Sequence, residues 1–155
     1  MILATLLAAS TGMAAPALDV TWVETRPDLR DKVVLLRWWT DGCELCRDAQ
    51  PVLEHLHRKY AARGLVVVGV YHPKPSRPVT EANVRAAATK LGLTFALAID
   101  ADWAALRRWN PDGGFTSPTF LLDKDGVVRF THPGGRYSAA DAAALRKAVA
   151  RLLRR

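Results

Sequence analysis

The sequence predicts an α/β fold in which helices flank a mixed central β-sheet. Short apolar runs with the length of buried strands alternate with segments whose apolar residues recur every three or four positions. The last two apolar runs instead follow one another around a turn that contains Asp-Gly, which is typical of an antiparallel hairpin. A chain of 155 residues, half of them apolar, can bury one sizeable core.

Six apolar runs are predicted to form strands, over residues 20–23, 33–39, 65–71, 95–99, 117–122 and 127–131. The first run is short and is expected at an edge of the sheet. The second is apolar apart from Arg37, which suits a central strand buried on both faces. A buried arginine is costly unless it is paired or points at an active site, so Arg37 is a candidate functional residue.

Four helices are expected, over residues 44–64, 80–91, 102–109 and 138–153. The first should kink at Pro51, because the proline nitrogen lacks the hydrogen that would bond to the carbonyl of Arg47. Thr80 can cap the second helix, and Ser138 with Asp141 resembles the box that starts a helix.

The N-terminus resembles a secretory signal peptide. Residues 2–18 carry no charge, and Ala15-Pro16-Ala17 offers small residues at the spacing that a signal peptidase reads. We therefore expect residues 1–17 to be a signal peptide, residues 18–155 to be the domain, and the protein to be exported to the periplasm. No Lys or Arg precedes the apolar run. An uncleaved membrane anchor and a disordered or packed N-terminal extension stay open as alternatives.

The charge of the chain gives little evidence for a nucleic-acid partner. The formal net charge is +7, with a basic cluster at the C-terminal end. A nucleic-acid interface would need a basic face with exposed aromatic residues or a known motif, and the sequence shows neither. The cluster is better explained as the solvated face of a last helix, where cations suit the helix dipole.

The only two cysteines, Cys43 and Cys46, stand two residues apart where a predicted strand leads into a predicted helix. Unpaired N–H groups at a helix start stabilise a thiolate, and the second cysteine lies within disulfide reach. Cys43 would be the nucleophile and Cys46 the resolving thiol. Two inert cysteines are one alternative. A zinc site with His55 and His57 is another, but this spacing fits no common zinc pattern, so we expect no metal ligands.

The predicted order of elements looks like a thioredoxin fold, and several separated motifs resemble the TlpA-like (redoxin) thiol-disulfide oxidoreductases. Within that family the chain is most similar to the thioredoxin-like domain of DipZ-type proteins. The resemblance implies a mixed sheet with the βα insertion typical of redoxins, and covers roughly residues 20–138. It is carried by residues 33–40, Cys43-x-x-Cys46-Arg47, Pro51, and residues 59–60, 64–70, 83–85, 99–100 and 122–126.

The resemblance also implies roles for individual residues. Cys43 matches the attacking cysteine and Cys46 the resolving one. Pro118 matches a proline that follows a cis peptide bond beside the disulfide, where Ser117 offers backbone groups to a substrate peptide; an ordinary trans proline is the alternative. Two supporting positions also match the family, the packing aromatic residue Trp39 and the kink proline Pro51.

Three positions depart from the family pattern. Gly42 replaces a bulky residue before the first cysteine, which should open the surface around Cys43 for substrate. Arg37 stands where relatives place Asp or Asn. It cannot relay protons because it stays protonated, and it would either stabilise the thiolate or extend to the edge of the sheet. Glu44 between the cysteines should oppose thiolate formation.

These features predict a thiol-disulfide oxidoreductase that passes electrons between Cys43–Cys46 and protein disulfides through a mixed disulfide. No cofactor is required, and a membrane-linked dithiol protein would donate or accept electrons. We expect a monomer. One alternative is a peroxiredoxin-like peroxidase; Thr40 fits its motif, but Arg37-Trp38-Trp39 supplies no proline. A copper or zinc carrier on the same fold is a further alternative.

Overall fold

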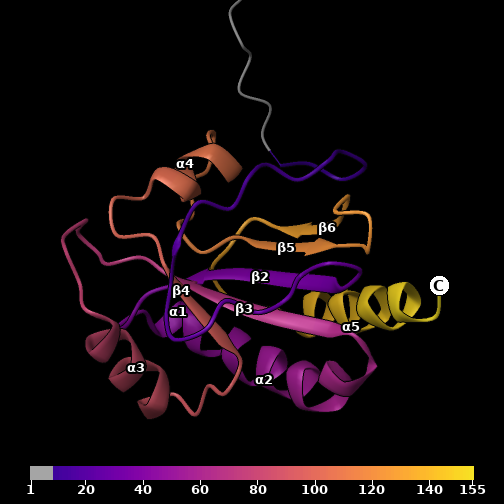
Figure 1. Cartoon of the computed structure of the whole chain (residues 1–155), viewed down its shortest axis with the longest axis horizontal. Helices are drawn as coiled ribbons and strands as arrows, with labels where there is room; N and C mark the ends of the chain where they lie inside the picture. Colours follow the sequence, from indigo (N-terminus) through magenta and orange to yellow (C-terminus); the bar gives the residue numbers. More distant parts are fainter. Residues whose placement is uncertain (1–8) are drawn as a thin grey trace, which may run out of the picture.

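The structure, a computed structural model, describes residues 9–155. Its strands form one six-stranded sheet in the order β1-β4-β3-β2-β5-β6 (Figure 1). The pairs β2–β3 and β3–β4 are parallel, and β1–β4, β2–β5 and β5–β6 are antiparallel. The strands are β1 (Thr21–Trp22), β2 (Val33–Trp39), β3 (Leu65–Tyr71), β4 (Ala96–Ile99), β5 (Thr119–Leu122) and β6 (Val128–His132).

Helices cover both faces of this sheet, so the predicted fold class is confirmed. Core residues of α2, α3 and α5 pack on one face, and those of α4 pack on the other (Figure 1). The unit of α3 and β4 between β3 and α4 is the expected βα insertion. The helices are α1 (Glu44–Arg47), α2 (Ala49–Tyr60), α3 (Glu81–Lys90), α4 (Ala104–Trp109) and α5 (Ala139–Leu153), with a 3₁₀ turn η1 (Ala61–Arg63).

Strand β2 lies in the middle of the sheet, and all seven of its residues are buried. Its side chains alternate between the two faces. Leu35 belongs to the core under α2 and α5, and Leu36 to the core under α4. Other elements therefore cover both faces of β2, which explains why its sequence is almost entirely apolar.

The helix predicted over residues 44–64 is divided into two segments, α1 and α2, and Asp48 between them keeps helical dihedral angles of φ −68° and ψ −27°. Pro51 is the physical reason for this division, because its nitrogen has no hydrogen to donate to the carbonyl of Arg47, the last residue of α1. The interruption therefore falls three residues before the proline. At the other end Gly64 has φ +98°, a left-handed conformation that glycine adopts without strain.

The N-terminal segment, residues 9–17, packs on the domain. Gly12 N donates to the carbonyl of Val128 at 2.8 Å, and Ala15 N donates to that of Gly126 at 2.9 Å. Trp109 Nε1 donates to the carbonyl of Ala17 at 3.2 Å. Cleavage after Ala17 stays a prediction, but it would remove a segment that covers the β6 edge. Residues 1–8 of the expected signal peptide lie outside the described residues.

Within residues 9–155, the structure contains no helix that combines the length and the apolar character needed to cross a membrane.

Candidate active site

The two cysteines form a disulfide at the start of α1. Cys43 is the N-cap of this helix, and the Cα atoms of Cys43 and Cys46 are 5.3 Å apart, within the usual range for disulfides. Cys46 is 3% exposed and packs in the core, whereas Cys43 is partly exposed. Cys43 is therefore the more accessible of the two cysteines to an incoming group. The predicted nucleophile and resolving thiol stay predictions, and this difference in exposure agrees with them.

The loop of residues 40–43, which ends at Cys43, is held in place by a hydrogen bond from β3. The hydroxyl of Tyr71 donates a hydrogen bond of 2.6 Å to Oδ1 of Asp41. Burial and the carboxylate of Asp41 raise the pKa of Tyr71 to about 12, so the hydroxyl keeps its proton. Gly42 has φ +71°, where a side chain would be strained, and a Cβ there would meet no neighbouring atom. Gly42 therefore lets the loop turn and leaves the space beside Cys43 open.

A groove of about 760 Å³ runs beside the disulfide. One wall is the loop of residues 40–43 together with Cys46, and the opposite wall is α3 with the residues that precede it. The groove contains the predicted substrate residue Gly42 but neither Ser117 nor Pro118. Its lining comprises Thr40, Asp41, Gly42, Cys43, Cys46, Arg47, Gln50, Tyr71, Arg77, Pro78, Val79, Asn83, Ala86, Ala87, Lys90 and Leu91.

The peptide bond expected to be cis before Pro118 is trans, and this expectation was wrong. Among the described residues, the cis bond precedes Pro75. The carbonyl of Pro118, the residue before β5, accepts a hydrogen bond from Trp38 N at 3.1 Å. Ser117 is 5% exposed, and its hydroxyl accepts a hydrogen bond of 3.0 Å from Gly135 N. A substrate-binding role of Ser117 and Pro118 stays a prediction.

Arg37 is fully buried in β2, so the alternative in which it extends to the edge of the sheet is wrong. Its Nη2 donates to the carbonyl of Gly135 at 2.7 Å, and its Nη1 donates to Oγ1 of Thr119 at 3.2 Å. The guanidinium also lies 4.9 Å from the centre of the Tyr137 ring. Burial lowers the pKa of Arg37, and Tyr137 opposes this effect. These contacts bind β2 to β5 and to the segment before α5; an effect on the thiolate stays a prediction.

Trp39 ends β2 directly before the loop of residues 40–43. It is fully buried, and its ring lies edge-on to the ring of Tyr71 with centroids 5.0 Å apart. A Cβ at Gly69 would lie 2.8 Å from Nε1 of Trp39, so only glycine fits on the neighbouring strand. The predicted packing role of Trp39 beneath the loop agrees with this geometry.

Three residues near the site were not singled out from the sequence. Tyr71 ends β3, and His72 follows it; because the parallel strands β2 and β3 pair Trp39 with Tyr71, the residues after both strands meet at one edge. Gln50 lines the groove from α2 and is 4% exposed. The parallel pairing of the two predicted strands could have placed Tyr71 and His72 near the cysteines. Nothing in the sequence indicates that Gln50 lies at the site.

His72 is fully buried between β3 and α4, and its ring lies edge-on to Trp103 with centroids 5.3 Å apart. Neither ring nitrogen has a hydrogen bond of normal geometry among residues 9–155, and the nearby backbone of Thr116 has only a small raising effect on the pKa of His72. Burial, with a smaller contribution from the charge of Lys74, lowers the pKa of His72 to about 4. The ring is therefore neutral near pH 7. Anywhere within residues 9–155, no group of three or more His, Cys, Asp or Glu side chains is arranged to hold a metal ion.

The sequence profile of the AhpC/TSA family matches residues 11–131. DipZ of Mycobacterium tuberculosis is 30% identical over 114 residues, which are 73% of this chain but only 16% of DipZ. The thiol-disulfide oxidoreductase ResA of Geobacillus thermodenitrificans is 30% identical over 126 residues, 79% of this chain and 68% of ResA. The predicted resemblance to redoxins and to DipZ is thereby confirmed.

Solved structures confirm the predicted thioredoxin fold. A proposed DsbE-type thiol:disulfide interchange protein from Chlorobium tepidum superposes with a TM-score of 0.79 at 24% identity, covering 94% of this chain and 99% of that one. A secreted disulfide oxidoreductase of Mycobacterium tuberculosis, described as homologous to DsbE of E. coli, superposes with a TM-score of 0.66 at 20% identity. The superposition covers 86% of this chain and 94% of the mycobacterial protein.

Proposed function

The chain belongs to the AhpC/TSA family, and from this premise we propose that it is a thiol-disulfide oxidoreductase that acts on disulfides of other proteins. The observation that carries this proposal is the Cys43–Cys46 disulfide, which joins a partly exposed cysteine at the N-cap of α1 to a buried one. The relative named thiol-disulfide oxidoreductase ResA supports it. Because the chain spans 16% of DipZ, activities of the whole of that protein are not carried over.

In the reducing direction the chemistry needs only the two cysteines. The Cys43 thiolate attacks one sulfur of a substrate disulfide, so that a mixed disulfide forms and the other substrate sulfur leaves as a thiolate. The Cys46 thiolate then attacks Sγ of Cys43 and releases the second substrate sulfur. Two electrons have moved from the dithiol to the substrate, which leaves the Cys43–Cys46 disulfide of the present structure.

The surroundings of Cys43 support its role as the nucleophile. It is the N-cap of α1, where backbone N–H groups without helical partners favour negative charge. Three cations, Arg47, Arg77 and Lys90, line the same groove and favour a thiolate over a thiol. Glu44 is exposed beside the site and opposes this effect.

We also propose that the protein works outside the cytoplasm, in the periplasm, where substrate disulfides persist. The secreted disulfide oxidoreductase of Mycobacterium tuberculosis, which shares the fold, supports this location. A second dithiol protein, linked to the membrane, would restore the reduced state of Cys43 and Cys46. No bound cofactor takes part in this exchange.

A turnover assay with insulin as the disulfide substrate and dithiothreitol as the electron donor tests the proposed function. The wild-type protein should accelerate insulin reduction, and Cys43→Ser should abolish the acceleration. Wild-type activity of both Cys43→Ser and Cys46→Ser would contradict the proposal. Consumption of hydrogen peroxide faster than by free thiol would instead favour the peroxidase alternative.

A further inference from the structure

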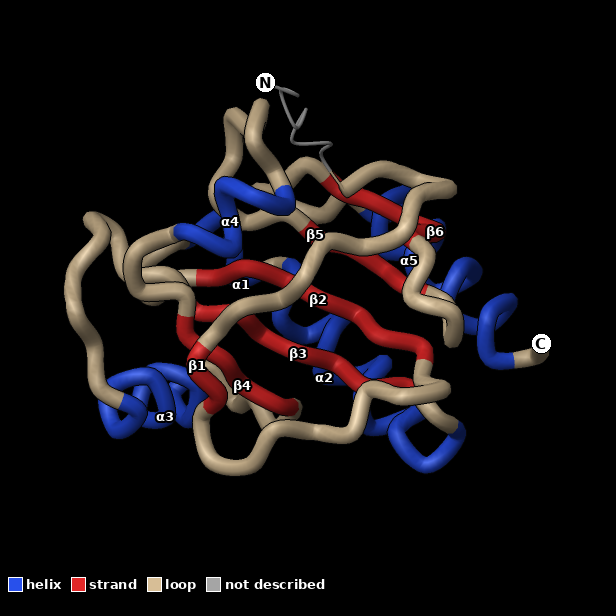
Figure 2. Tube along the Cα trace, turned by 45° about the horizontal axis from the view of Figure 1, so that its top comes forward, coloured by secondary structure: helices blue, strands red, loops and turns tan. Residues whose placement is uncertain are grey.

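The groove beside the disulfide has the size of a binding site. Its volume of about 760 Å³ lies within the range of about 300 to 1,000 Å³ that ligand sites occupy. The reactive Cys43 lies in one wall, and the opposite wall comes from α3 and the residues before it. In Figure 2, α3 lies beside the sheet, next to the β1–β4 edge. The inserted α3–β4 unit therefore creates a surface that a substrate must meet when its disulfide reaches Cys43.

This surface is positively charged. Arg47, Arg77 and Lys90 line the groove, and all three are exposed. Within residues 9–155 none of them forms an ion pair. Arg77 donates one hydrogen bond, from Nη1 to the carbonyl of Pro75 at 3.3 Å. These cations are available to an anionic partner.

The acidic side chain in the groove is already engaged. Asp41 accepts the 2.6 Å hydrogen bond from the Tyr71 hydroxyl, which partly satisfies its carboxylate. Three cations against one carboxylate leave a net positive charge along the groove. A substrate that carries carboxylates would gain attraction here, and a basic substrate would be repelled.

Two further features favour a peptide over a small anion. Val79, Ala87 and Leu91, from α3 and the residues that flank it, add apolar lining to the groove, which suits side chains of an extended chain. Gln50 lines the groove at 4% exposure, and neither Oε1 nor Nε2 has a hydrogen-bond partner within the described residues. A buried amide without partners is costly. A peptide main chain supplies both a donor and an acceptor once the Gln50 side chain turns towards the groove.

We propose that the substrate of Cys43 is a peptide segment in which acidic residues flank the disulfide, bound between the loop of residues 40–43 and α3. This inference rests on the proposed function and names its substrate class. The acidic side chains pair with Arg77 and Lys90, which places one substrate sulfur at Cys43. Attack by the Cys43 thiolate forms the mixed disulfide and expels the other substrate sulfur, and Cys46 then closes the enzyme disulfide.

A single-turnover experiment with the reduced full-length protein tests the proposal. Three synthetic peptides contain the same intramolecular disulfide, flanked by Glu, Gln or Lys, and acid quenching followed by mass spectrometry gives each reduction rate. Each rate is divided by that with dithiothreitol, which removes the intrinsic reactivity of the peptide. At low salt we expect the Glu peptide to exceed the Gln peptide by about fivefold to twentyfold, with the Lys peptide slowest. In high salt the advantage should shrink.

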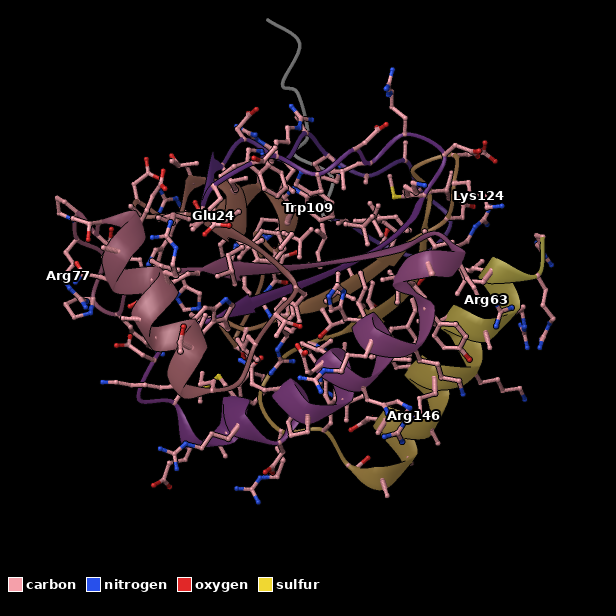
Figure 3. The ribbon with its side chains drawn as sticks, turned by 60° about the horizontal axis from the view of Figure 1, so that its bottom comes forward. Glu24, Arg63, Arg77, Trp109, Lys124 and Arg146 are labelled. Atoms are coloured by element: carbon pink, nitrogen blue, oxygen red, sulfur yellow. A yellow bond between two sulfur atoms is a disulfide. The ribbon has the colours of Figure 1, made fainter. Side chains whose placement is uncertain are left out.

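Charge-neutralising variants locate the effect. The double variant Arg77→Gln/Lys90→Gln should bring the Glu-to-Gln rate ratio to within about twofold of one. Arg146→Gln on α5 is the matched control, because Arg146 lies away from Arg77 (Figure 3), and it should keep the wild-type ratio. Equal wild-type rates for the three peptides, or a double variant with an unchanged ratio, would overturn the proposal.

Two arms separate this inference from the function on which it rests. If the reduced protein reduces none of the three peptides, the proposed function fails. If it reduces all of them at equal rates, only the acidic substrate class fails. Glutathione disulfide, which carries carboxylates without an extended chain, is the fourth substrate. A normalised rate above that of the Glu peptide would overturn the assignment to a peptide.

Discussion

The hydroxyl of Tyr71, at the end of β3, donates a 2.6 Å hydrogen bond to the carboxylate of Asp41, in the loop that leads to Cys43. The two residues are 30 positions apart in the chain. A hydrogen bond to a charged acceptor is stronger than a neutral one. This bond therefore ties the loop beside the disulfide to the central sheet.

Tyr71→Phe should lower the free energy of unfolding by about 1 to 2 kcal/mol, because it leaves Asp41 without this donor. The wild-type pH profile gives a second readout. Since the pKa of Tyr71 is raised to about 12, its stabilising effect is complete below pH 10 and declines as the pH rises from 10 towards 12. Tyr71→Phe should lack this part of the decline.

Tyr60→Phe is the control for Tyr71→Phe. Tyr60 is also buried, but its hydroxyl takes part in no hydrogen bond within residues 9–155, so the change should stay below about 0.5 kcal/mol. Urea denaturation of both variants measures the difference. Equal losses would contradict the role of the Tyr71–Asp41 bond.

His72 should make the protein sensitive to mild acid. The folded state lowers the pKa of this buried ring from 6.5 to about 4, so the unfolded chain binds more protons between these values. Stability from the neutral ring is complete above pH 6.5 and is lost as the pH falls towards 4, by roughly 3 kcal/mol. His72→Phe keeps an aromatic ring beside Trp103 and removes the titration. Denaturation curves from pH 7 to 4 should therefore fall less steeply for the variant; parallel curves would rule out this assignment.

Asp100 joins three elements of the fold. Its carboxylate accepts hydrogen bonds from Trp38 Nε1 at 3.0 Å and from the backbone of Ala105 and Leu106 at 3.1 and 2.7 Å. Asp100→Ala leaves three buried donors unpaired and should lower the free energy of unfolding by about 3 kcal/mol. The control is Asp102→Ala, which removes one exposed hydrogen bond, from Ala104 N to the Asp102 carboxylate. This change should lower the free energy of unfolding by less than about 1 kcal/mol. Thermal denaturation that ranks the two variants equally would refute this role of Asp100.

Removal of residues 9–17 should destabilise the domain. This segment contributes backbone hydrogen bonds to β6 and the turn before it, and accepts one from Trp109. The free energy of unfolding of a protein that starts at Leu18 should be about 2 to 4 kcal/mol lower than that of a protein that starts at Ala9. Comparison of these two truncations isolates the segment. An exported form that begins at Leu18 with undiminished stability would contradict this prediction and would support cleavage after Ala17.

The sheet could be predicted from the sequence because its central strands are short, nearly continuous apolar runs. Strand β2 at Val33–Trp39 and strand β3 at Leu65–Tyr71 coincide with their apolar runs. The effect of Pro51 could also be predicted, because its nitrogen has no hydrogen for the carbonyl of Arg47, and the helix is divided at the next residue, Asp48.

The partners of the buried polar groups could not be predicted, because they come from distant parts of the chain. Arg37 bonds to Thr119 and Gly135, 82 and 98 residues away. The cysteines could be found from their spacing alone. The groove could not, because Arg47, Arg77 and Lys90 come from separate segments that only the tertiary fold brings together.

The most direct test of the proposed function is to identify which cysteine attacks the substrate disulfide. Reduced Cys46→Ser, mixed with insulin and quenched with acid, should accumulate a mixed disulfide that mass spectrometry of the digest locates at Cys43. Reduced Cys43→Ser should accumulate little or none, because Cys46 is 3% exposed. An adduct at Cys46 in equal amount, or no adduct in either variant, would contradict the account.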